Sequence, residues 1–358
     1  MTVEANVAAY SASRSANAGA LFAAALILST ILPFCGIALT PTYPSIAPVV
    51  AFALLLGSTH VAATFYLLTD GAVRRFFCGH PIRMIVVPCA LFAAGIAVFA
   101  HAENPIFVPA LLLTSLWQTW HFGAQNIGVA TFISLTDRGR PLLRYEKIAI
   151  RAGVVVGMLG VLKAMAPIYM IGENYVPLGP TAASIIGLFY DVGLVAAVPL
   201  TALALWLAAG AWIRQQYLFG IGIFLSVTFL FTMYVSRDYT LGFISFAAAH
   251  GLQYLIFLFA HSASRGKEAF AKWRLPVVAI LAPLALLLFM AASRLIAVEP
   301  GGASSIAISI MLSVSLVHFW LDQFMWRMKD KDRAAWIKAR FRYVFARPSG
   351  GTPSAVTP

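Results

Sequence analysis

Residues 106–132 read IFVPALLLTSLWQTWHFGAQNIGVATF and contain no Asp, Glu, Lys or Arg. An α-helix needs about 20 apolar residues to cross a bilayer, so this run is long enough to be a transmembrane helix. Within it, Thr114, Gln118, His121 and Gln125 recur at the spacing that places side chains on one helix face. The run therefore predicts a membrane helix that carries a polar stripe.

The rest of the chain has the same apolar character. Of its 358 residues, 61% are hydrophobic and only 11% are charged, against about 25% charged in soluble domains. We therefore predict an all-α, polytopic membrane bundle of about ten transmembrane helices, with no separate soluble catalytic domain. The expected spans are residues 20–39, 45–68, 82–100, 106–132, 148–172, 192–213, 217–235, 240–261, 275–296 and 303–326.

The basic residues indicate the orientation of this bundle. Placing the N-terminus inside puts 22 of the 25 Lys and Arg residues on the cytoplasmic side, and only Lys163, Arg237 and Arg294 fall elsewhere. Because membrane proteins concentrate Lys and Arg in cytoplasmic loops, we expect both termini in the cytoplasm of a bacterial-type inner membrane. Topology then accounts for the net charge of +12, and no nucleic-acid partner is expected.

Four segments follow from this pattern. Residues 1–18 are expected to form a cytoplasmic N-terminal segment, and residues 19–326 the membrane bundle, with 20–39 as a retained span rather than a signal peptide. Residues 327–347 are basic with interleaved aromatic residues, which favours an amphipathic helix in contact with anionic lipid. An ordinary positive-inside anchor is the simpler reading of that segment. Residues 348–358 are expected to be a disordered tail.

Histidine residues inside the predicted spans are the main candidates for chemistry, because ionisable groups in a bilayer are costly. His60, His121, His250 and His318 lie in four spans that run in the same direction. Counted from the outer ends, all four lie roughly 15 to 23 Å into the hydrocarbon core. This shared depth predicts that the four imidazoles form one layer, although unrelated packed histidines, or separate pairs, are alternatives.

Such a layer could hold a metal ion. Asp322 follows His318 by one turn, and Gln125 follows His121, so either could orient a ligand or complete the coordination as a catalytic group. The three cysteines have no paired spacing, which argues against a disulfide framework or a zinc–thiolate site. Histidine with carboxylate fits iron, zinc or copper, and a single haem is also open. Oxygen chemistry on apolar substrates favours iron.

Three further ionisable residues need an explanation. Lys163 is the one deep cation, expected to pair with an acid or to extend toward the outer surface. Asp191 follows Thr181 to Tyr190, which could form either an outer interfacial helix or the start of the sixth span. His261 is expected at the cytoplasmic end of its helix, either as an interfacial residue or as part of an entry or proton route.

One local motif resembles a known family. Trp120-His121-Phe122-Gly123, followed by Gln125, is similar to the bacterial Brp/Blh-type carotenoid dioxygenases, which are multi-span membrane proteins. The resemblance implies iron-dependent oxygenative cleavage of a polyene, with His60, His121, His250 and His318 as iron ligands. That family carries two of its histidines one turn apart on one helix, whereas His250 and His318 lie on separate spans here.

Three functions stay open from the sequence alone. The first is an iron-dependent oxygenase that takes a lipid-soluble substrate, such as a carotenoid, laterally from the bilayer. The second is a transporter or proton-coupled permease with a histidine and aspartate relay. The third is a scaffold that binds a pigment or another small molecule without turning it over.

Overall fold

The computed structural model describes residues 3–39, 60–61, 64–100, 106–165, 180–235, 239–264 and 303–345. Within these ranges the chain is helical and contains no strand, as the sequence predicts. The expected span 275–296, most of the expected span 45–68, and the expected tail 348–358 lie outside the described residues.

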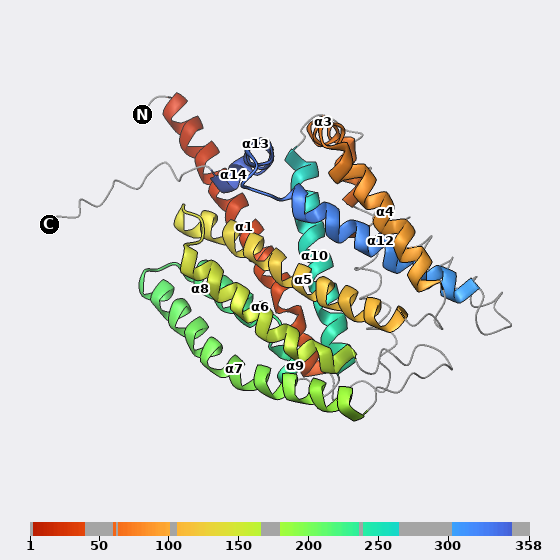
Figure 1. Cartoon of the computed structure of the whole chain (residues 1–358). Helices are drawn as coiled ribbons and strands as arrows, with labels where there is room; N and C mark the ends of the chain where they lie inside the picture. The colour runs from red at the N-terminus through yellow and green to blue at the C-terminus, as the bar shows by residue number, and fades with distance from the viewer. Residues whose placement is uncertain are drawn as a thin grey trace.

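The described helices are arranged along the chain in the order that Figure 1 shows. Two helix ends have clear causes. The Asp70 side chain accepts the Ala72 N–H at the start of the helix Gly71–Gly79, and Gly139 ends the helix Phe107–Arg138 in the left-handed conformation, at φ 67°. The elements are α1 (Val3–Leu39), η1 (Phe65–Thr69), α3 (Gly71–Gly79), η2 (Ile82–Val86), α4 (Val87–Phe99), α5 (Phe107–Arg138), α6 (Arg144–Met165), α7 (Pro180–Ile213), α8 (Tyr217–Thr228), α9 (Thr232–Val235), α10 (Tyr239–Ser264), α12 (Ala303–Met325), α13 (Lys331–Arg340) and α14 (Arg342–Phe345).

Three segments of the described residues are long and apolar enough to cross a membrane, namely Asn17–Cys35, Ile82–Phe99 and Thr181–Ile213. The last of these is one continuous helix from Pro180, so residues 181–190 begin α7 rather than forming a separate outer helix. Much of α7 is exposed, including Trp206 at 68%, which suits a helix that faces lipid. The total of about ten spans and the cytoplasmic termini stay predictions.

The helices pack as successive rows (Figure 1). One side is formed by α7, which packs on α6 and α8, and the other side is formed by α4 and α12. Between them lie α1, α5 and α10. Gly153 lets α6 approach α8 closely, and Gly157 lets it approach the turn after α8, because a Cβ atom would overlap Val227 at the first position and Leu230 at the second.

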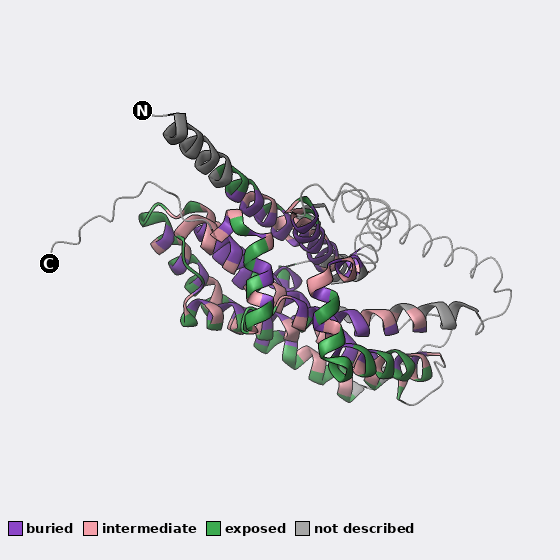
Figure 2. Ribbon diagram, turned by 90° about the horizontal axis from the view of Figure 1, so that it is seen from above, coloured by how far each residue is buried: buried purple, intermediate pink, exposed green. Residues whose placement is uncertain are grey.

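Buried residues run through the middle of the bundle, while α7 is exposed along much of its length (Figure 2). The C-terminal helices α13 and α14 also contribute to the core, through Trp336, Ile337, Phe341 and Val344. The apolar side of the predicted amphipathic segment 327–347 thus packs on the protein itself. Contact of its basic residues with anionic lipid stays a prediction.

Candidate metal centre

The four histidines predicted to share one layer lie in a single buried cluster. The ring centroids of His60 and His250 are 4.6 Å apart, those of His60 and His318 4.7 Å, and those of His121 and His250 4.8 Å. No more than 7% of any of the four residues is exposed. The four imidazoles therefore lie together and are neither scattered nor split into two separate pairs, whereas their depth in a bilayer stays a prediction.

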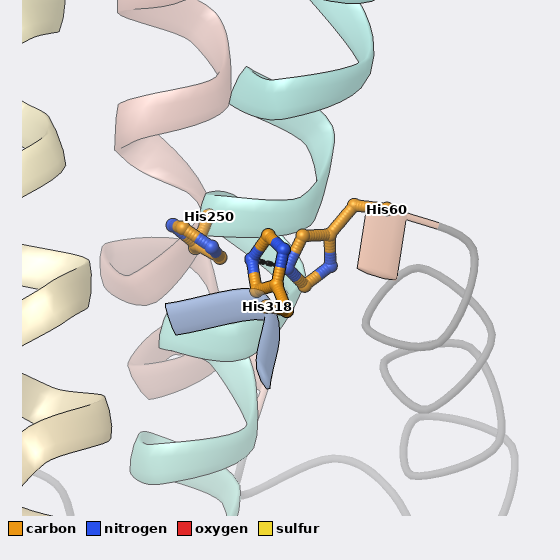
Figure 3. Close-up of side chains that lie close together, drawn as sticks. All are labelled: His60, His250 and His318. Carbon is orange, nitrogen blue, oxygen red and sulfur yellow. Dashed lines mark hydrogen bonds between the residues drawn. The ribbon is translucent and has the colours of Figure 1, made fainter. Parts of the chain in front are cut away.

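Each histidine comes from a different part of the bundle. His121 lies on α5, His250 on α10 and His318 on α12, whereas His60 lies in the short described segment before η1. Figure 3 shows His60, His250 and His318 converging, with the His60 and His318 rings joined by their facing nitrogens. Four rings carried by separate helices keep their positions because the surrounding helix packing fixes each one.

The separation of the facing nitrogens suits a shared metal ion. The Nε2 atoms of His60 and His318 are 3.2 Å apart. Two nitrogens bound tetrahedrally at about 2.0–2.1 Å from one ion lie about 3.3 Å from each other. Two overlapping groups offer metal-ligand atoms within 4.8 Å of one another, His60 with His250 and His318, and His121 with His318 and Asp322.

Thr64 determines which nitrogen of His318 is available. The Thr64 hydroxyl donates to the carbonyl oxygen of His60 at 3.0 Å, and its oxygen lies 2.9 Å from Nδ1 of His318. Because the single hydroxyl hydrogen is already used, Nδ1 of His318 carries the proton and donates to Thr64. Its Nε2 atom then presents a lone pair toward Nε2 of His60, which a metal ion could use, and His318 occurs in both groups of ligand atoms.

The cluster also leaves several buried polar atoms without a hydrogen bond among the described residues. These are Nε2 of His121, both ring nitrogens of His250, and Oδ1 of Asp322. Buried polar atoms without partners are rare in folded proteins and call for an explanation such as an ion. A metal ion at this position would satisfy imidazole nitrogens and a carboxylate oxygen together, so the donor set fits a metal such as iron.

Asp322 is the carboxylate of the cluster. It is 6% exposed, and its Oδ2 atom lies 3.6 Å from Nε2 of His121, which is too long for a good hydrogen bond. Lying one turn after His318 on α12, it faces the same site. The 2-His-1-carboxylate set that it forms with His121 and His318 is the ligand pattern of many non-haem iron oxygenases.

Gln125 has a different position from the histidines. Its Nε2 atom donates to Oε1 of Gln253 at 2.9 Å and to the carbonyl oxygen of His250 at 3.3 Å. Gln253 in turn donates to Thr30 and Asn126. Gln125 therefore joins an amide network that holds the backbone of α10 at His250, which gives it a positioning role rather than direct contact with an imidazole.

Aromatic side chains surround the cluster. Phe122 packs on His250 at 4.7 Å between ring centroids, and Phe319 on His121 at 4.9 Å. Tyr254 lies 5.7 Å from His60 and 5.6 Å from His318. Trp117, 6.2 Å from Phe319, extends this wall. The rings exclude water around the nitrogens and present an apolar surface to any ligand.

His261 does not extend the histidine cluster. It is fully buried at the end of α10, where its Nε2 atom lies 3.2 Å from Oδ2 of Asp70. The same carboxylate accepts hydrogen bonds from Trp336 and Arg340 on α13. No local sequence pattern predicts this junction, because most of its members are far apart along the chain.

The surroundings of Asp70 keep its carboxylate charged. Burial acts to raise its pKa, but hydrogen bonds from His261, Trp336 and Ala72, together with the charge of Arg340, hold it well below its usual range. The Asp70 junction, defined as these five residues, therefore fastens α13 to the ends of α3 and α10.

The two other ionisable residues singled out from the sequence lie away from the cluster. The Lys163 ammonium stands 4.0 Å from the ring centroid of Tyr190, as a cation–π contact. Asp191 is exposed on α7. Neither residue forms part of the metal centre.

Comparisons with known proteins return no family model, curated protein or solved structure that matches this chain. Functional inference therefore depends on the geometry of the histidine cluster.

Proposed function

We propose that this protein is an inner-membrane metalloenzyme of the bacterial type that holds iron on His60, His121, His250 and His318. It acts as an oxygenase on a lipid-soluble substrate, with carotenoids as the leading class. The observation that carries the proposal is the convergence of four buried imidazoles, two of which, His121 and His250, have ring nitrogens without a hydrogen bond among the described residues. Helices that suit a bilayer and the aromatic wall of the cluster support an apolar substrate.

The proposed topology has about ten spans with both termini in the cytoplasm. It rests on the distribution of Lys and Arg and on the apolar runs of the sequence, and three described segments are long and apolar enough to span a membrane. In this orientation the histidine cluster lies within the bilayer, where a substrate could enter laterally without crossing water.

The chemistry of such an enzyme would be oxygenative cleavage of a carbon–carbon double bond. One C=C bond and the O–O bond break and two C=O bonds form, so both oxygen atoms enter the products and no external reductant is needed. Iron supplies the binding and activation of dioxygen. The protein contributes the imidazole ligands, the orientation of His318 by Thr64, and the aromatic residues that exclude water.

Metal analysis tests the proposal. Full-length protein purified in detergent is compared with single His→Ala variants at positions 60, 121, 250 and 318. His80→Ala is the control, because His80 is an exposed histidine outside the cluster. Gel filtration checks that each variant is folded.

We expect near-stoichiometric iron in the wild type and the His80→Ala variant, and reduced iron in the other four. Carotenoid turnover should likewise be retained in the wild type and the His80→Ala variant and reduced in the other four. Undiminished iron in the four variants, or a folded wild type that cannot be loaded with ferrous iron, would overturn the proposal.

A transporter is the second candidate. It is favoured by the 3.6 Å approach of His121 to Asp322 and by the amide network that connects α5, α10 and α1. Substrate or proton flux in proteoliposomes discriminates the two functions. An oxygenase should show no flux, whereas a relay of these residues should lose its flux in Asp322→Asn.

A further inference from the structure

A small cavity lies next to the histidine cluster, between η1, α3 and α12. It has a volume of about 10 Å³, which is roughly the room that one water-sized molecule needs. Its lining consists of Thr64, Leu67, Leu68, Val73, Phe77, Leu321 and Met325.

The lining determines which molecule can occupy this cavity. Six of its seven residues are apolar, and the Thr64 hydroxyl is already engaged by His60 and His318. A buried water molecule needs two to four polar partners, so water gains little in this cavity. The apolar lining therefore favours a small apolar molecule, and the volume of the cavity excludes a lipid or a polyene.

The position of the cavity connects it to the proposed metal. Thr64 lines the cavity and contacts Nδ1 of His318. Leu321 and Met325 follow His318 by three and seven residues on the same face of α12. The opposite wall includes Leu68 and Phe77, which are partly exposed. The cavity therefore lies between the surface of the bundle and the histidine cluster.

We propose that this cavity binds dioxygen on its way to the metal centre, an inference that rests on the proposed oxygenase function. Dioxygen is small and apolar, and it dissolves better in hydrocarbon than in water. A separate gas site would let dioxygen reach the metal from the η1 side while a bulky substrate occupies the aromatic side near Trp117 and Phe319.

The methyl group of Met325 offers a direct probe of the cavity. Full-length protein labelled with ¹³C-methyl methionine is compared under dioxygen and under dinitrogen, and the difference gives the paramagnetic relaxation caused by dioxygen alone. Met233 is the control, because it is as buried as Met325 but packs in another cluster. Signals are assigned with Met325→Leu and Met233→Leu.

We expect dioxygen to relax the Met325 methyl more strongly than the Met233 methyl. Leu68→Phe, which fills the cavity from its partly exposed wall, should remove this excess, and Leu68→Ala should increase it. Equal relaxation of the two methyl groups in the wild type, or an excess that neither variant changes, would overturn the proposal without touching the metal assignment.

A second measurement tests delivery to the metal. Nitric oxide binds ferrous iron, so its association rate with iron-loaded protein can be followed by stopped-flow absorbance. Leu68→Phe should slow association several-fold without lowering iron content, and the matched Leu312→Phe on α12, outside the cavity lining, should not. Equal rates in all three proteins would overturn the delivery role. A wild type without iron would defeat both proposals, and metal analysis identifies that result before any gas is added.

Discussion

The hydroxyl group of Thr64 has one hydrogen, and its use on the carbonyl oxygen of His60 fixes the tautomer of His318. The spacing of His60 and Thr64 is one helical turn, so periodicity predicts that the two are neighbours. That spacing could not show that the oxygen of Thr64 also reaches a histidine on α12. Periodicity predicts neighbours on one helix, but partners on another helix depend on packing that only the structure shows.

Removing this hydroxyl group should weaken metal binding. In Thr64→Val, the valine side chain keeps the shape of threonine but lacks the hydroxyl group. Nδ1 of His318 then loses its acceptor, and the ring is no longer held in the orientation that presents Nε2 to the cluster. Loss of such a supporting hydrogen bond typically costs about 10–100-fold in metal affinity, measurable by titration against a chelator. Thr64→Ser should stay close to the wild type. Equal affinity in the valine variant would show that His318 does not need Thr64.

At the scale of elements, the close contact of α6 with the turn that follows α8 depends on glycine. An alanine methyl at Gly157 would overlap Leu230, whereas one at Gly187 on α7 would meet no atom within 4 Å. Gly157→Ala should therefore lower the free energy of unfolding by about 1–3 kcal/mol, as measured by denaturant titration in micelles. Gly187→Ala should be neutral or slightly stabilising. Similar effects at both positions would contradict the close packing.

The Asp70 junction makes the attachment of α13 sensitive to acid. Because the pKa of Asp70 is lower in the folded protein than its usual value, its stabilising contribution is present above about pH 4 and is lost as pH falls below that value. Asp70→Asn should lower stability by on the order of 3 kcal/mol at neutral pH and weaken this acid dependence. Proteolysis of α13 over a pH series measures the change.

Asp332→Asn on the exposed side of α13 is the matched control, because it removes one acidic charge without touching the junction. It should keep the protease resistance and the pH profile of the wild type. If the two variants behave alike, Asp70 does not fasten α13.

At the scale of the whole molecule, the sequence predicts the helical class and the clustering of histidines. Each prediction depends only on where apolar runs begin and end and on where the histidines lie within them. Apolar runs long enough to cross a bilayer predict helices. Histidines at equal depth in spans of the same direction, such as His121 and His318, are predicted to be able to meet. The cavity beside Thr64 and the contact of Asp70 with α13 depend on distant segments. Neither leaves a local pattern that could be recognised in the sequence.

The predicted orientation can be tested at Cys78, which is exposed on α3. This helix lies in the basic segment between the expected spans 45–68 and 82–100, which is predicted to be cytoplasmic. With Cys35 and Cys89 changed to serine, a membrane-impermeant maleimide should label Cys78 only after the cells are permeabilised. A cysteine placed at Glu173, in a predicted outer loop, should be labelled in intact cells. Labelling of Cys78 in intact cells would reverse the proposed topology.

X-ray absorption at the iron edge tests the central claim most directly, because it reports the ligands of the metal itself. For the wild type we predict a shell of nitrogen and oxygen atoms, scattering from several imidazole rings and no sulfur, with fewer rings in His250→Ala. His80→Ala should match the wild type. A sulfur shell, iron without imidazole scattering, or a spectrum unchanged in His250→Ala would contradict a metal centre built from these four histidines.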